Sequence, residues 1–205
     1  MKKAAFGIRM HSGWGVAVAI DDKNEIVDRR RIVIVDEDAP GGKMPFHHAE
    51  NMALPSAEKF LAGYTAECDR QARHELAKAH EDLIARGYRV DVAALVLASG
   101  RALPELGQIL ASHPMIHAAE GELFRGSVRC ACQALGLRVI GYRERDLPGH
   151  VKAIFARSAD NLVSSVNHAG KILGPPWTGD YKAAAFAACL ALRECSRELP
   201  KASTA

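Results

Sequence analysis

The sequence contains no hydrophobic run long enough to cross a membrane. None of its stretches reaches the roughly 18 consecutive apolar residues that a transmembrane helix requires. The two lysines at positions 2 and 3 precede apolar residues, but Arg9, His11 and Ser12 soon interrupt them, which argues against a signal peptide. We therefore expect a cytoplasmic protein without a membrane partner.

Cysteine is scarce and is not arranged for cross-linking. The chain has five cysteines, an odd number, and none lies in the paired C-x₂-C units that are typical of structural zinc sites. Cys130 and Cys132 form a C-x-C within a segment of helical pattern. This usage indicates reduced, buried thiols rather than a disulfide framework.

A strong charge of one sign is also missing. Lysine and arginine number 27 and aspartate and glutamate 24, so the net charge is +3. The pI of about 8.6 lies below the value near 9 that marks dedicated nucleic-acid binders. With 205 residues and about 150 residues per domain, we expect a single domain over residues 1–200 and a flexible tail at 201–205.

Three runs of strand length open the chain, over residues 4–10, 15–20 and 25–35. Short polar turns separate them, and the third run is rich in β-branched residues, so they predict an antiparallel meander. Residues 36–55 follow as a polar loop that contains Pro-Gly-Gly and the pair His47-His48. A patternless loop of this length is unusual in a compact domain and is typical of functional loops or insertions.

The remainder of the chain alternates between helix and strand patterns. Apolar residues at three- and four-residue steps predict a long helix over 56–86, and the run at 92–98 is apolar enough for a buried parallel strand. Further helices are predicted over 104–111, 117–135, 160–173 and 180–198, with a fifth strand over 137–142. This order predicts an α/β fold with a mixed five-stranded sheet, a three-strand antiparallel meander plus two parallel strands, and helices on both faces.

Three motifs in this order resemble the ribonuclease H-like superfamily, and within it the RuvC-type branch. Residues 7–16 read GIRMHSGWGV, similar to a RuvC-like opening strand of the form GIDPGSxxxGxGV. Residues 151–154 read VKAI, similar to the family's VK-x-A before a helix. Residues 179–187 read GDYKAAAFA, similar to its closing helix of the form DxxDALAxA. The resemblance implies a ribonuclease H-like fold and nucleic acid as a partner.

The chain departs from this family where the resemblance implies acidic residues. Such proteins carry an aspartate in the first strand, a glutamate near the end of the fourth and aspartates in the last helix, because two divalent cations must be held about 4 Å apart. Here Arg9 stands in the first strand, residues 97–101 read LASGR, and Lys182 matches the final aspartate with only Asp180 nearby. Cationic side chains repel magnesium, so we expect a catalytically degenerate domain with no metal and no cofactor.

The resemblance implies that the ends of the first and fourth strands and the start of the last helix share one cleft. Arginine binds phosphate and carboxylate groups through its planar fork of donors. We therefore expect the cleft to bind nucleic acid or a phosphorylated ligand. The candidate ligand-binding residues are Arg9, His11, Ser99, Arg101, Asp180 and Lys182.

The densest group of polar side chains points to a different kind of protein, because His117 and Glu120 lie one helical turn apart on one face. An acid–base pair of these residues near Arg9 would define an enzyme, a hydrolase or nuclease of non-standard chemistry. The spacing His113-x₃-His117-x₂-Glu120 also permits a metal site, although capping of the helix by Ser112 or His113 is the simpler interpretation. The sequence is also compatible with an actin-like phosphate-binding protein and with a homodimer formed through the 56–86 helix.

Overall fold

The computed structural model describes residues 1–98 and 102–198, so the predicted tail at 201–205 lies outside the described residues. The strands are β1 (Lys2–Met10), β2 (Trp14–Asp21), β3 (Ile26–Val33), β4 (Tyr88–Leu97) and β5 (Arg138–Arg143). The helices are α1 (Pro45–Ala49), α2 (Leu54–Ala85), α3 (Leu106–Leu110), α4 (His113–Ala134), α5 (Leu147–Phe155), α6 (Ala159–Leu173) and α7 (Gly179–Glu198). Two short 3₁₀ turns, η1 (Glu144–Asp146) and η2 (Ala156–Ser158), flank α5.

The five strands form one sheet in the order β3-β2-β1-β4-β5. The first three are antiparallel neighbours, and β4 and β5 run parallel to β1. This is the predicted mixed sheet. Because β1, β4 and β5 run in the same direction, their carboxyl ends meet at one edge, which is the usual position of a ligand site in such sheets.

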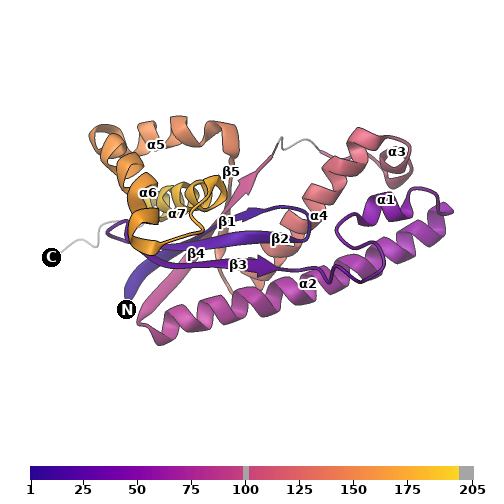
Figure 1. Ribbon diagram of the computed structural model, residues 1–205, viewed down its shortest axis with the longest axis horizontal. Coiled ribbons are helices and arrows are strands. Elements are labelled where there is room, and N and C mark those ends of the chain that lie inside the picture. Colours follow the sequence, from indigo (N-terminus) through magenta and orange to yellow (C-terminus); the bar gives the residue numbers. More distant parts are fainter. Residues whose placement is uncertain (99–101, 199–205) are drawn as a thin grey trace.

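Helices cover both faces of the sheet, as predicted: α5, α6 and α7 lie on one face, and α2 and α4 on the other (Figure 1). Alternation along β1 determines which residue faces which layer. Phe6 and Ile8 pack with α2 and α4, whereas Ala5 belongs to the core beneath α7. Arg9 shares the parity of Ala5, so its side chain emerges on the α7 side, at the carboxyl edge.

Helix α2 continues beyond the sheet, and its first half packs against α1, α3 and the start of α4 (Figure 1). A separate apolar cluster holds this region together, with Phe46, Leu61, Ile109 and Ile116 among its buried members. The predicted patternless loop at 36–55 is therefore partly helical. Its middle, α1, is only five residues long, too short for periodicity to show.

Two further elements differ from the sequence-based prediction. Helix α4 begins at His113, four residues before its predicted start, with Pro114 in its first turn and no side-chain cap from Ser112. Helix α5 is absent from the prediction, because its first turn contains Pro148 and Gly149, which read as a break. Proline is nevertheless well accommodated at the start of a helix, where its missing N–H needs no partner.

Three consecutive arginines on β3 divide between the two faces of the sheet. Arg29 donates to the carbonyl oxygens of Leu173 and Pro176, at 2.6 Å each, near the carboxyl end of α6. Arg30 instead pairs with Asp82 on α2. The triplet is therefore an edge-strand feature with structural partners on both sides, not a continuous basic patch.

The five cysteines are free and differ in exposure: Cys68, Cys132 and Cys189 are buried, Cys195 is half-buried and Cys130 is exposed. The prediction of buried thiols is wrong for Cys130, because residues two apart on a helix point in different directions. Burial raises the pKa of the Cys132 and Cys189 thiols to about 12.

Native thiol labelling should therefore be selective. Iodoacetamide at pH 8 should alkylate Cys130 readily, because its thiol is exposed to the reagent. The three buried cysteines should react only after denaturation. Peptide mass spectrometry before and after unfolding measures this, and native modification of Cys132 at the rate of Cys130 would contradict the packing described here.

No helix in the described ranges combines the length and the apolar character needed to span a bilayer.

Candidate functional site

An arginine occupies the carboxyl edge of the sheet where the resemblance implies a metal-binding aspartate. Strand β1 brings Arg9 to this edge, and α7 begins directly beside it at Gly179. The Arg9 Nη1 atom lies 2.6 Å from Asp180 Oδ1, and the two side chains are 20% and 24% exposed. A charge-assisted contact of this length in a partly desolvated position fixes both groups.

A second carboxylate reaches the same guanidinium from β5. Glu144 follows the last residue of that strand directly. Its Oε2 lies 3.0 Å from Arg9 Nη2, and Arg9 Nε lies 3.3 Å from both carboxylate oxygens. Sequence reasoning missed Glu144, although its position immediately after a strand parallel to β1 was a usable signal.

His11 completes the group from the turn after β1. Its Nε2 lies 2.5 Å from Arg9 Nη1 and 3.1 Å from Asp180 Oδ2. A single ring nitrogen either accepts from the guanidinium or donates to the carboxylate, so it satisfies one of the two at a time. The ring stacks on Trp14 at 4.4 Å between centroids, and the Arg31 guanidinium lies 4.0 Å from the Trp14 ring centre.

This arrangement has a definite electrostatic character. The Arg9 guanidinium offers only hydrogen-bond donors, so it cannot ligate a metal. It occupies the space between Asp180 and Glu144 and satisfies both carboxylates. The two acids therefore face a fixed organic cation, which leaves them poorly disposed to hold a divalent ion.

The predicted cleft residues divide into three groups. Arg9, His11 and Asp180 come together as expected. Lys182 does not join them: it lies two residues beyond Asp180, on a different side of α7, and has no ion pair within residues 1–98 and 102–198. Ser99 and Arg101 lie outside the described residues.

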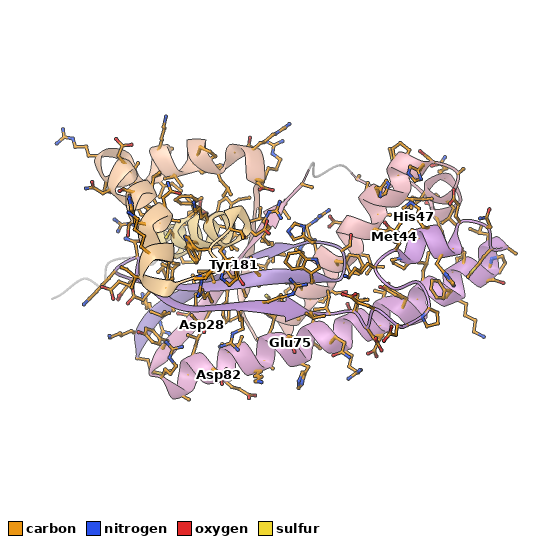
Figure 2. All side chains as sticks on the ribbon, viewed as in Figure 1. Asp28, Met44, His47, Glu75, Asp82 and Tyr181 are labelled. Carbon is orange, nitrogen blue, oxygen red and sulfur yellow. The ribbon has the colours of Figure 1, made fainter. Side chains whose placement is uncertain are left out.

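The proposed acid–base pair His117 and Glu120 belongs to a different cluster. Glu120 is buried and contacts His47 of α1, while His117 contacts His113. Figure 2 shows His47 well separated from Tyr181, the neighbour of Asp180, which lies over the sheet. The structure therefore does not bring His117 and Glu120 to Arg9, as an enzyme built on these residues would require.

The sheet order β3-β2-β1-β4-β5 with helices on both faces defines an α/β fold built on a mixed five-stranded sheet. Among solved structures, the chain is similar to Thermus thermophilus RuvC in complex with Holliday junction substrate, with a TM-score of 0.51 and 12% identity over 96% of each chain. Another Thermus thermophilus RuvC structure gives a TM-score of 0.48 and 13% identity, covering 95% of this chain and 96% of that one. No protein-family model matches the sequence, and no curated protein matches it. At 12% identity, the likeness to the first of these structures shows a RuvC-like, ribonuclease H-like fold and nothing beyond the fold.

Proposed function

We propose that this chain is a catalytically degenerate RuvC-like domain that binds structured nucleic acid without cleaving it by two-metal chemistry. The observation that carries the proposal is the position of the Arg9 guanidinium between Asp180 and Glu144. Two-metal hydrolysis needs carboxylates that are free to bridge cations across a scissile phosphate. In this chain, the two acids that converge at this edge of the sheet are already paired with one guanidinium.

A basic segment that begins at the site supports nucleic acid as the ligand. Residues 138–173, from β5 through α6, contain six Lys and Arg against three Asp and Glu. This excess equals the net charge of +3 for the whole chain. Lys152, Arg157 and Lys171 are exposed and form no ion pair in the described part of the chain. Such free cations bind phosphate backbones by releasing counterions.

The neighbouring structure suggests which nucleic acid to test first. Thermus thermophilus RuvC is in complex with a Holliday junction substrate, so a four-way DNA junction is the natural first ligand here. A small phosphorylated ligand at Arg9 is less favoured, because two carboxylates already engage that guanidinium. An incoming phosphate would have to displace at least one of them.

We expect the protein to bind a fluorescent four-way junction in an anisotropy titration and to lose affinity steeply between about 50 and 200 mM salt. The DNA should stay intact when Mg²⁺ or Mn²⁺ is added. The double variant Lys152→Glu/Arg157→Glu should bind at least about tenfold more weakly at low salt, because two phosphate-facing cations become acids.

Lys78→Glu is the matched control, because Lys78 is exposed on α2 across the sheet and should matter little. Metal-dependent cleavage that Asp180→Asn abolishes would refute the degenerate site. Equal losses of affinity in the Lys78 variant and the double variant would refute the binding surface.

A further inference from the structure

Three histidines from two separate helices converge where α1 meets the start of α4, in a cluster that does not include Arg9. His113 and His117 lie four residues apart on one face of α4, and His47 comes from α1. Each offers one ligand atom, and the three ligand atoms lie within 4.8 Å of one another. The Nε2 atoms of His113 and His117 are 3.1 Å apart. Around a tetrahedral zinc with Zn–N bonds of about 2.0–2.1 Å, ligand nitrogens are about 3.3 Å apart. The His113–His117 pair is already close to this spacing, and the His47 nitrogen would have to move closer to them.

The three imidazole rings are inclined to one another and are not stacked. Ring centroids are 4.6 Å apart for His113 and His117, 4.7 Å for His47 and His117, and 5.0 Å for His47 and His113. The planes are inclined by 82°, 59° and 79° respectively. Inclined rings allow three ring nitrogens to point at one centre, which parallel rings would not.

Glu120 determines which nitrogen of His47 is available. The Glu120 Oε1 atom lies 2.8 Å from His47 Nδ1, and the carboxylate is only 4% exposed. A carboxylate can only accept, so Nδ1 carries the hydrogen and the lone pair is on Nε2. That Nε2 is buried and has no hydrogen-bond partner in the structure. Metal-binding histidines commonly have this arrangement, with a carboxylate on one ring nitrogen and the opposite nitrogen open to the ion.

The Glu120 carboxylate also lies near His117. Its Oε2 lies 3.8 Å from His117 Nδ1, which again leaves Nε2 facing the cluster. No Lys or Arg within residues 1–98 and 102–198 pairs with Glu120. A buried carboxylate without a cationic partner is costly, and a dication bound to the adjacent imidazoles would compensate its charge.

We propose that His47, His113 and His117 bind one zinc-class divalent transition-metal ion through their Nε2 atoms, with Glu120 as the positioning residue. Three imidazoles suit Zn²⁺, Ni²⁺ or Cu²⁺ rather than magnesium. His113 and His117 are exposed, so the fourth position faces solvent and takes water or an exchangeable ligand, unlike a closed structural site. A metal site here departs from the sequence-based expectation of none, and it is independent of nucleic-acid binding at the Arg9 end.

The bound ion would also attach α1 to α4. Helix α1 lacks a side-chain cap and belongs to the segment between β3 and α2 that the sequence pattern predicts as a long loop. Coordination by His47 would link the middle of this segment, through the metal ion, to His113 and His117 on α4. In the sequence, only its place in that loop pointed to His47. A contact between residues 47 and 113 leaves no periodic pattern in the sequence.

The test uses tag-free full-length protein, stripped of metal with a chelator and titrated with ZnCl₂ by calorimetry. We expect one Zn²⁺ per chain, bound at micromolar or lower concentration. His117→Ala should weaken binding about 100-fold or more, since one of three ligands is lost. Glu120→Gln keeps a hydrogen-bond acceptor but removes the charge, and should weaken binding about 10- to 100-fold. Circular dichroism checks that each variant folds.

His74→Ala is the matched control, because His74 is exposed on α2 and belongs to no metal-binding group among the described residues. It should bind zinc like the wild type. Co²⁺ in place of Zn²⁺ should give the visible bands of a nitrogen-ligated tetrahedral ion, without thiolate charge transfer. Absence of binding, equal binding by wild type and His117→Ala, or loss of binding in Cys130→Ser in place of the histidine variants would each overturn the proposal.

Discussion

Arg9→Asp should convert a site that excludes divalent cations into one that binds them. The substitution removes the guanidinium from between Asp180 and Glu144 and places a third carboxylate beside them. Three acids in one crevice repel one another, so the variant should be destabilised by about 2–3 kcal/mol without metal, given the partial exposure of the group. Added Mn²⁺ should reverse this loss, because a ligand at 100 times its Kd stabilises by about 2.7 kcal/mol.

The measurement is thermal unfolding with and without Mn²⁺, alongside electron paramagnetic resonance of the free ion. Arg9→Ala separates the two effects of the substitution, since it removes the cation and adds no acid. It should gain less from Mn²⁺ than Arg9→Asp does, and the wild type should gain nothing from an ion at this end of the molecule. An equal Mn²⁺ response in wild type and Arg9→Asp would show that Arg9 does not control the site.

Gly7→Ala should be among the most destabilising single-methyl changes in the chain. A Cβ at this position would lie 1.8 Å from the carbonyl oxygen of Ala184 and 2.9 Å from the backbone nitrogen of Ala188. These are backbone atoms of α7, so no rotamer change relieves the clash, and the helix must move away from β1. Overpacking of this kind costs about 3 kcal/mol or more, which lowers Tm by about 6–12 °C in a protein of this size.

The displacement should also reach the site, because Asp180 lies four residues before Ala184 on the same face of α7. Gly63→Ala is a control for which we expect a gain in stability instead of a loss. Gly63 is exposed on α2 and a Cβ there meets nothing within 4 Å, so alanine should stabilise the helix by about 0.5–1 kcal/mol. Denaturant unfolding measures both variants. Similar stability of Gly7→Ala and wild type would contradict the close packing of α7 on β1.

The sequence predicted the sheet well because its strands have strong local signals. The β-branched and apolar runs that became β1, β2 and β4 are recognisable one at a time, and their order restricts the topology. The helix predicted over 180–198 is likewise present as α7, and its buried alanines pack on the sheet. By contrast, α1 and α5 are short or begin with proline and glycine, which local patterns read as loops.

The site residues were harder to predict, because their partners are distant in sequence. Arg9 and Asp180 were identified through the resemblance of their motifs, but Glu144 belongs to no motif. Lys182 was grouped with them on motif alignment, and the helical turn directs it elsewhere. His117 and Glu120 were correctly seen as neighbours, whereas their third partner, His47, is 73 residues from Glu120. Such contacts follow from tertiary packing and leave no periodic trace.

Two separate sites of the molecule thus have different chemistry. At the carboxyl edge of the sheet, Arg9 lies between two carboxylates, at the position where the family resemblance implies an aspartate. At the end of α2, an imidazole cluster with a buried carboxylate has the composition of a transition-metal site. The two sites share no residue, so the variants proposed for one leave the other intact.

The most direct test of the account is a crystal structure of the wild-type protein soaked in MnCl₂, with anomalous diffraction recorded for manganese. The account predicts no anomalous peak between Asp180 and Glu144, and an Arg9 guanidinium that still bridges both carboxylates. A manganese peak between these two side chains, with Arg9 turned away from them, would contradict it.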